Sequence, residues 1–278
     1  MGTVKSAYVF TDLEGVAGVD DWDPRSSDYA AQAKGVYERA EMQRLLTGEV
    51  NAAAEGLLAA GVEEILVNDA HGAGRTILVE ELISGVQIVR GRDRPGWVLG
   101  MTPRFDALVQ VGMHPMAGTP DGCLAHTQSR GYIYRINGRE FGEMEQAALL
   151  AGELGIPWIF TSGDAHACRE AEGWVPGMVT APVKTGLATT CAIHLAPVDA
   201  RNLIQERVQE AVARAGEIAP LMLEGPFVLD IVREEPWPAQ IRSGAERVDA
   251  FTVRYTGDTF WQVFHHHFYG EPDFPMPR

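Results

Sequence analysis

Four short runs of apolar and β-branched residues stand out in the first two thirds of the chain. They are residues 7–10 (AYVF), 63–69 (EEILVND), 107–114 (ALVQVGMH) and 157–164 (PWIFTSGD). Continuous apolar runs of this length are typical of strands that are covered on both faces, which is the usual state of a strand in a parallel sheet. The pattern therefore predicts a buried, mostly parallel sheet.

Segments rich in helix-forming residues lie between the predicted strands. Residues 37–60 end at Gly61 and residues 143–154 end at Gly155. Glycine is the residue that most often follows the last turn of a helix, so both segments are predicted to be helices. Strands that alternate with helices in this way predict an α/β fold, with a mostly parallel sheet flanked by helices.

The pattern changes in the last third of the chain. A helix is expected over residues 199–215, and strands are expected in residues 226–234 and 251–255. The last of these alternates apolar and polar positions, as antiparallel strands do. We therefore expect an α/β domain over residues 1–195 and a smaller α+β domain over residues 196–278. No internal repeat or low-complexity linker is visible.

The composition limits the partners to be expected. The 278 residues are 46% hydrophobic, and 38 acidic against 23 basic residues give a formal charge of −15. This charge argues against binding to nucleic acid or to an anionic membrane, because both are negatively charged. No stretch approaches the roughly 20 apolar residues of a membrane span. The three cysteines form no CxxC pair, so we expect a cytoplasmic protein with reduced thiols.

Acidic and imidazole side chains follow the predicted strands at the point where each strand ends. In chain order they are Asp12, Glu14, Asp69, His71, His114, Asp164 and His166. In open α/β sheets ligands bind outside the carboxyl ends of the strands, where these groups would meet. Few basic residues lie beside these motifs, so a divalent cation is the better candidate to balance the carboxylates. Zinc is the first choice, with manganese or iron if oxygen ligands dominate.

Each residue taken alone also has an ordinary structural interpretation. Asp12 could form a turn, His71 could be a loop histidine, and His114 could be a buried core residue. Glu143 begins a predicted helix, where the helix dipole favours an acid whatever its function. No compact HExxH motif is present. The metal hypothesis therefore depends on the recurrence of such groups at successive strand ends.

Five longer segments occur in an order that is typical of one protein family. The segment TDLEGVAG resembles the DxEGxxG part of the signature SxDxEGxxG. After it come VNDAHG, VGMHPMAGTPDGCLAHTQS, GREFGEMEQAALLAGELGIP and SGDAHACREAE. Together, over residues 7–197, they resemble the DppA-type D-aminopeptidases, a family of binuclear zinc peptidases. The resemblance implies a phosphorylase-like α/β core and a homodecameric ring. It also implies an aminopeptidase that removes N-terminal residues, D-amino acids in particular, from short peptides.

The resemblance also assigns metal ligands. Asp12 would bridge two zinc ions, which together would activate a water molecule and polarise the scissile carbonyl group. Glu14 and His71 would complete the site of one ion. His114 and Glu143 would complete the site of the other. These residues would make residues 1–195 a metal-binding catalytic domain.

Three single residues and one histidine triplet carry further groups that could have a function. His126, in LAHTQS, falls at the family's catalytic histidine, where it would move a proton to the leaving amine or bind the tetrahedral oxygen. His166 is an extra imidazole that the family pattern lacks; it could tune substrate choice, but we expect it to be incidental, because a lone loop histidine is usually solvated. Lys184, in APVKTG, could bind a substrate carboxylate, but a surface lysine is expected. The HHH triplet at residues 265–267, with aromatic neighbours, predicts a packed helix or a subunit contact.

Two other functions remain open from the residues alone. A phosphorylase or nucleosidase could use the same kind of core, but no glycine-rich phosphate cradle is present, and acids at the strand ends would repel phosphate. A non-catalytic metal-binding protein could hold the same ligands around a closed site. The preference for D-residues is implied by the resemblance alone, because it depends on pocket walls that the sequence does not locate.

Overall fold

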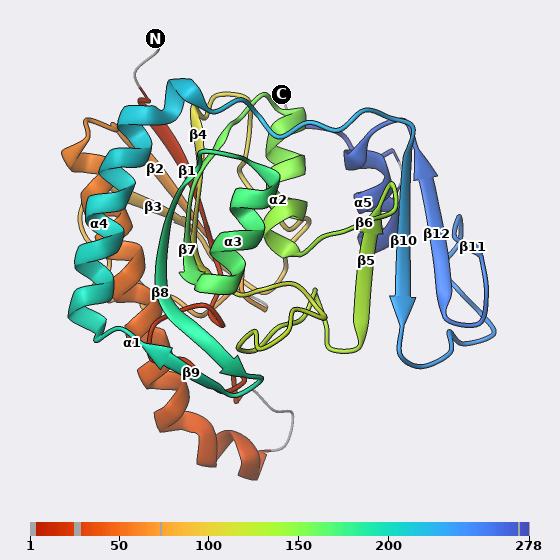
Figure 1. Ribbon diagram of the computed structural model, residues 1–278, viewed down its shortest axis with the longest axis horizontal. Helices are drawn as coiled ribbons and strands as arrows, with labels where there is room; N and C mark the ends of the chain where they lie inside the picture. The colour runs from red at the N-terminus through yellow and green to blue at the C-terminus, as the bar shows by residue number, and fades with distance from the viewer. Residues whose placement is uncertain (1–3, 25–28, 73, 272, 278) are drawn as a thin grey trace.

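Two sheets form the framework of the molecule, one mostly parallel and one antiparallel (Figure 1). The structure is a computed structural model that describes residues 4–24, 29–72, 74–271 and 273–277. The larger sheet is covered by helices on both faces, and the smaller sheet is packed beside it.

The larger sheet contains the strands β1 (Ser6–Thr11), β2 (Glu64–Asp69), β3 (Val86–Val89), β4 (Ala107–Met113), β7 (Trp158–Asp164), β8 (Val179–Ala188) and β9 (Cys191–His194). Their order across the sheet is β3-β2-β1-β4-β7-β8-β9. All neighbours pair in parallel except β8 and β9, which pair antiparallel. The chain thus builds outward in one direction from β1 and in the other direction from β4. Such a reversal of strand order is where ligands bind in sheets of this type.

Helices cover both faces of this sheet (Figure 1). They are α1 (Tyr29–Ala59), α2 (Glu143–Glu153), α3 (Ala165–Trp174) and α4 (Pro197–Arg214), with the short 3-10 helices η1 (Val79–Glu81) and η2 (Ala215–Glu217) between elements. Side chains of β1 alternate between two cores. Ala7 and Val9 pack in the core under α1 and α4, whereas Tyr8 and Phe10 pack in the core shared with α2. Every residue of β1 is buried, as expected for a strand covered on both sides.

The smaller sheet is antiparallel throughout. It contains β5 (Tyr132–Ile136), β6 (Arg139–Glu140), β10 (Phe227–Arg233), β11 (Glu246–Arg247) and β12 (Thr252–Gly257), in the order β11-β12-β10-β5-β6, and α5 (Phe260–Tyr269) packs against it. Apolar side chains of this sheet and of α5 join the same core as Tyr8 and Phe10. The two sheets are therefore held together by one continuous core.

The predicted α/β fold with a mostly parallel sheet is confirmed, and so is the antiparallel pairing of the C-terminal strands. Helix α1 begins eight residues before the predicted start at Tyr37, and Gly35 inside its first turns explains why the helical pattern was weak there. Elements cross the expected boundary at residue 195, because β5 and β6 lie in the smaller sheet while α4 packs against α1. The division into residues 1–195 and 196–278 stays a prediction.

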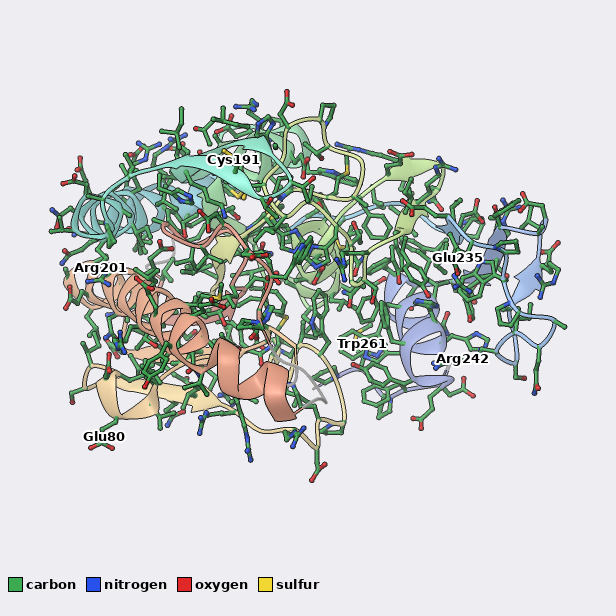
Figure 2. The ribbon with its side chains drawn as sticks, turned by 90° about the horizontal axis from the view of Figure 1, so that it is seen from below. Glu80, Cys191, Arg201, Glu235, Arg242 and Trp261 are labelled. Carbon is green, nitrogen blue, oxygen red and sulfur yellow. The ribbon has the colours of Figure 1, made fainter. Side chains whose placement is uncertain are left out.

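Two further expectations concern the thiol groups of the cysteines and the helices that could span a membrane. Cys123 and Cys168 are buried and Cys191 is exposed on the outer strand β9 (Figure 2), and all three are free thiols. Among the described residues, no helix combines the length and the apolar character needed to cross a membrane.

Candidate metal centre

The strand order determines which predicted site residues meet. Because β1 pairs with β2 on one side and with β4 on the other, residues that follow β1 lie between residues that follow its neighbours. Asp12 follows β1, His71 follows β2 and His114 follows β4. The three side chains therefore converge at the carboxyl edge of the sheet, where the strand order reverses.

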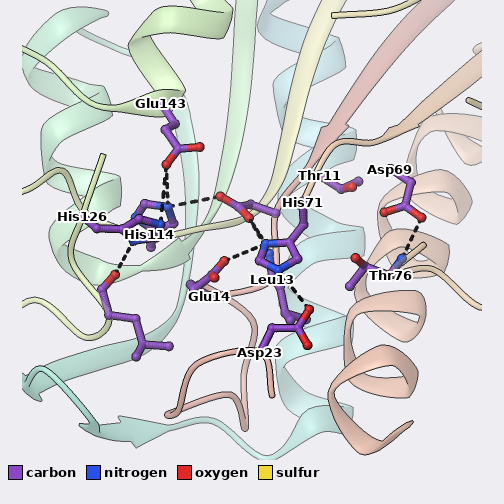
Figure 3. A network of polar contacts seen from close by, with 12 residues as sticks. Thr11, Leu13, Glu14, Asp23, Asp69, His71, Thr76, His114, His126 and Glu143 are labelled. Carbon is purple, nitrogen blue, oxygen red and sulfur yellow. Dashed lines mark hydrogen bonds and ion pairs between the residues drawn. The ribbon is translucent and has the colours of Figure 1, made fainter. Parts of the chain in front are cut away.

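Asp12 lies between two imidazole rings. Its Oδ1 is 2.9 Å from Nδ1 of His71, and its Oδ2 is 3.2 Å from Nε2 of His114. Each ring has a second carboxylate beside it. Oε2 of Glu14 is 3.0 Å from Nδ1 of His71, and Oε1 of Glu143 is 3.4 Å from Nε2 of His114. Figure 3 shows the two histidines side by side in one network, each with its own glutamate. The structure thus brings all five predicted ligands into one cluster, called the metal cluster below.

Two glycines let the loops of this cluster approach each other closely. The N–H of Gly15 donates to the carbonyl oxygen of Gly112 at 2.8 Å. A Cβ atom at Gly15 would lie 2.0 Å from the carbonyl oxygen of Met113, and one at Gly112, whose φ is +78°, would lie 2.2 Å from that of Asp12. Side chains at either position would push apart the backbones that carry Asp12 and His114, so glycine is required there.

Each histidine of the site is oriented by a hydrogen bond on the nitrogen that faces away from the cluster. Nδ1 of His114 donates to the carbonyl oxygen of the next residue at 2.9 Å, and Nδ1 of His126 donates to that of Leu124 at 2.8 Å. A carbonyl oxygen only accepts, so in the neutral rings Nε2 of His114 and of His126 keeps a free lone pair. Nε2 of His71 lies 3.3 Å from Oδ2 of Asp23, a carboxylate that fixes the ring and raises its basicity.

Asp23 is a residue of the site that the sequence analysis missed. It lies in the acidic run VDDWDP, and nothing in that run distinguishes it from Asp20 and Asp21. Its Oδ1 accepts a hydrogen bond from Nε of Arg39 in α1 at 3.1 Å, so the loop that carries it is tied to a helix. The only signal available was the position of the acidic run directly after the segment TDLEGVAG.

The donor atoms of the metal cluster fit divalent cations. Nε2 of His114 and Oε2 of Glu14 are buried, and both face charged groups of the cluster: the first lies 3.2 Å from Asp12 and 3.4 Å from Glu143, and the second lies 3.0 Å from His71. Ligand atoms of Asp12, Glu14 and His114 lie within 4.8 Å of one another, and so do those of His114, His126 and Glu143. Imidazole nitrogens and carboxylate oxygens at such distances suit zinc.

Burial and mutual contacts shift the pKa values of the metal cluster. Burial alone would raise the pKa of Asp12, but the hydrogen bonds from His114 and His71 outweigh it and hold this pKa well below its usual range. Burial would lower the pKa of both histidines, yet the adjacent carboxylates of Glu14 and Asp12 keep the two pKa values well above the ordinary value. Protons therefore occupy this cluster in the absence of cations, and bound cations would displace them.

His126 lies beside the cluster and differs from the other histidines in its charge state. Its ring stacks on His114, with centroids 4.0 Å apart and planes 13° apart, and its Nε2 is 3.7 Å from Oε1 of Glu143. Burial and the neighbouring imidazole of His114 lower the pKa of His126. The ring is therefore neutral at neutral pH and can accept a proton.

The cluster opens into a cavity of about 330 Å³, called the metal cavity below. Glu14, His71, His126 and Glu143 line it, together with Gln128. None of its described lining residues is lysine or arginine. A phosphate site usually has basic side chains to hold the anion, so this lining does not favour a phosphorylase.

Three of the groups at predicted strand ends lie outside the metal cluster. Oδ2 of Asp69 accepts two backbone N–H groups of the following loop, at 2.8 and 3.1 Å. Asp164 caps α3 by accepting the N–H of His166 at 2.8 Å. His166 lies half-buried in the first turn of α3, so the expectation of a solvated loop residue is wrong. Its ring contacts Arg169 instead of the cluster, with Nη2 to Nδ1 at 2.9 Å. Both aspartates thus have the turn and cap roles that are common for acids after strands.

The prediction that Lys184 is a surface residue is wrong. Only 2% of it is exposed, and its Nζ donates to the backbone carbonyl oxygens of Glu14 and Val19, the latter at 2.7 Å. The lysine therefore supports the loop that carries Asp12 and Glu14. The error arose because no strand was predicted over β8, where Lys184 points inward.

The three consecutive histidines near the C-terminus are part of α5. His265 is 2% exposed and stacks on Trp261 with ring centroids 4.2 Å apart. The prediction of a packed helix is confirmed, and none of the three histidines lines the metal cavity.

Comparison with known proteins agrees with this geometry. The family model described as D-aminopeptidase matches residues 6–267. A D-aminopeptidase of Bacillus subtilis (strain 168) is 30% identical over 226 residues, which are 81% of this chain and 80% of that protein. The solved structure of the Zn-dependent D-aminopeptidase DppA from Bacillus subtilis, described as a self-compartmentalizing protease, matches with a TM-score of 0.81 and 26% identity over 94% of each chain. The family and the peptidase class predicted from the sequence are thereby confirmed, and the phosphorylase alternative is not favoured: the chain belongs to the D-aminopeptidase family.

Proposed function

We propose that this protein is a zinc-dependent aminopeptidase that removes N-terminal D-amino acids from short peptides. The observation that carries the proposal is the position of Asp12, whose two oxygens face His71 and His114 separately. Each of these rings has a second carboxylate at its side and a hydrogen bond on its far side. A carboxylate placed between two such pairs of histidine and glutamate is suited to bridge two cations.

The proposed ligands follow from this arrangement. Asp12 would bridge the two zinc ions. Glu14 and His71 would hold one ion, and His114 and Glu143 would hold the other. When bound, the ions would supply Lewis-acid activation of water and of the scissile carbonyl group.

The chain's own residues would position the substrate and move the proton. None of the described residues that line the metal cavity is lysine or arginine, so no fixed basic side chain there would repel the free α-amine of the substrate. His126 would accept a proton through Nε2 and pass it to the leaving amine, because its neutral ring keeps that lone pair free. The bond from its Nδ1 to the carbonyl oxygen of Leu124 prevents the ring from turning away. The N–H of Gln128, which donates to Oε1 of Glu143 at 2.7 Å, fixes that carboxylate.

We also propose that the enzyme is a homodecamer in the cytoplasm that acts on short peptides and binds neither nucleic acid nor membranes. The relative from Bacillus subtilis is described as self-compartmentalizing, which supports an enclosed assembly of several chains. The formal charge of −15 and the free thiols support the proposed partners and location.

A metal analysis combined with amide hydrolysis tests the function. We expect two zinc ions per chain, faster hydrolysis of D-alaninamide than of L-alaninamide, loss of activity on treatment with a chelator, and recovery when zinc is returned. His166→Ala serves as the matched control, because this histidine lies outside the metal cavity and its variant should keep both zinc and activity. Bound zinc without hydrolysis of any D- or L-aminoacyl amide would indicate a metal-binding protein. Phosphate-dependent cleavage of a nucleoside would indicate a phosphorylase.

A further inference from the structure

A second cavity, walled by aromatic rings, adjoins the metal cavity. It has a volume of about 290 Å³ and shares Gln128 with the metal cavity as a lining residue. Its aromatic walls are formed by Tyr132, Tyr134, Trp237, Tyr255 and Phe268. These rings come from the antiparallel sheet, from α5 and from the loop after β10. Figure 2 shows Arg242, another lining residue, close to α5. We call this space the aromatic cavity.

The walls of the aromatic cavity are held in place by contacts among themselves. Tyr134 and Phe268 are stacked, with centroids 6.2 Å apart and planes 9° apart. Tyr132 meets Trp237 edge to face at 6.1 Å, and the guanidinium group of Arg233 lies over both rings, 5.4 and 5.0 Å from their centroids. A preformed aromatic wall binds an apolar group without first having to be ordered.

A few polar groups accompany these rings. Tyr134 and His267 share a hydrogen bond of 3.2 Å between the phenol oxygen and Nε2. Nδ1 of His267 is buried and has no hydrogen bond to any described residue. Arg242 donates from Nη1 to the carbonyl oxygen of His267 at 2.6 Å. Seven of the eleven described lining residues are aromatic or aliphatic, and such a lining with polar groups placed among the rings is the usual character of a site for a small ligand.

Gln128 forms a fixed partition between the two cavities. Its φ of +63° is in the left-handed region, which a residue with a side chain adopts only where its surroundings hold it. Two contacts do so here. Its N–H donates to Glu143, and its Nε2 donates to Oε1 of Gln146 at 2.8 Å. The partition is thus fixed to a residue of the metal cluster on one side and borders the aromatic cavity on the other.

We propose that the aromatic cavity binds the side chain of the residue that follows the scissile bond, and that the enzyme prefers peptides whose second residue is aromatic or large and apolar. This inference rests on the proposed function, which determines in which direction the bound peptide runs from the scissile bond. His126, which would give a proton to the leaving amine, precedes Gln128 by two residues on the same loop. The amine therefore leaves on the Gln128 side of the metal cavity, and the chain beyond it continues toward the aromatic rings.

Specificity constants for dipeptides test the proposal. The zinc-loaded enzyme should show a kcat/KM about 10- to 100-fold higher for D-alanyl-phenylalanine than for D-alanyl-glycine, the range that burial of one aromatic side chain supplies. Trp237→Ala and Tyr132→Ala should reduce this ratio toward one, and Trp237→Phe, which keeps a ring, should restore most of it. Phe251→Ala is the matched control, because this exposed aromatic residue does not line the cavity and its variant should keep the ratio.

Three outcomes would overturn the proposal. The first is equal kcat/KM for the two dipeptides, and the second is a preference that survives both alanine variants in correctly folded protein. The third is a preference that depends on the N-terminal side chain only, which would assign the cavity to that residue.

Hydrolysis of D-alaninamide separates this inference from the proposed function, because the amide has no second side chain. If the zinc-loaded enzyme does not cleave the amide or any dipeptide, the proposed function fails. Calorimetric titration of the metal-free protein with the two dipeptides then still tests the cavity. Tighter binding of D-alanyl-phenylalanine that Trp237→Ala abolishes supports it, and equal affinities overturn it.

Discussion

At the scale of single residues, the metal cluster separates groups that would bind cations from a group that would move a proton. Asp12→Asn should lose both zinc ions, because a neutral amide cannot bridge two cations as a carboxylate does.

His126→Ala should keep the zinc content and lower kcat by about 10²- to 10⁴-fold, the usual contribution of a general acid or base. Elemental analysis and kcat measured on the same preparations distinguish the two effects. Full activity of His126→Ala would remove this histidine from the mechanism.

A buried acid behind the cluster makes stability depend on pH. Glu49 accepts the N–H of Ala17 at 2.8 Å, and burial raises its pKa from 4.5 to about 8. The folded protein therefore binds this proton more tightly than the unfolded chain does. The resulting stability is complete below pH 4.5, and it is lost as the pH rises toward 8, by up to about 1.4 kcal/mol per pH unit.

Glu49→Gln should remove this loss, because the amide keeps the acceptor oxygen and does not titrate. The free energy of unfolding, measured in urea with a chelator present, should fall less steeply for the variant than for the wild-type protein between pH 6 and pH 9. Parallel curves for the two proteins would show that the Glu49 carboxyl group does not cause the pH dependence.

The residues of the site differ in how far the sequence reveals them. Asp12, His71 and His114 could be predicted because each lies within two residues of the end of a strand, and parallel strands bring their carboxyl ends to one edge. His126 and the metal role of Glu143 required the family resemblance, since neither follows a strand. Asp23, Gln128 and Lys184 reach the site from loops and from an unpredicted strand. Their contacts depend on tertiary packing that no local pattern records.

At the scale of elements, burial decided which strands were predictable. β1, β4 and β7 are buried along their whole length, so they appear as continuous apolar runs. β3 lies at the edge of the sheet, and β5 is half-exposed in the smaller sheet, so neither run is continuously buried. Covered central strands thus leave a clear signal in the sequence, and edge strands leave a weak one.

One side chain connects two helices end to end. Glu153, at the last turn of α2, accepts the N–H of Phe260 at 2.6 Å and that of Trp261 at 2.7 Å, and so caps the start of α5. Glu153→Ala should lower the free energy of unfolding by about 1–3 kcal/mol, because two buried N–H groups lose their acceptor. Glu206→Ala, an exposed acid on α4, should change it by less than about 0.5 kcal/mol. Urea unfolding of both variants measures the difference, and equal effects would exclude the cap.

At the scale of the whole molecule, the hairpin of β8 and β9 is a surface suited to contact another copy of the chain. β9 is the outermost strand of the larger sheet, so one of its edges has no neighbouring strand. Leu187, Ile193 and Val198, in and just after this hairpin, are 51%, 64% and 61% exposed. Exposed apolar side chains beside an open strand edge are typical of an interface.

If the proposed homodecamer forms through this hairpin, Ile193→Glu should reduce it to smaller species, because a charge at the interface would have to be buried without a partner. Light scattering during gel filtration should give a mass near that of ten chains for the wild-type protein and a clearly lower mass for the variant.

The zinc content of Ile193→Glu should remain unchanged, since Ile193 does not line the metal cavity. Val79→Glu changes a comparably apolar residue, 44% exposed on η1, and should leave the mass intact. An unchanged mass of Ile193→Glu would place the interface elsewhere, and a monomeric wild-type protein would contradict the ring itself.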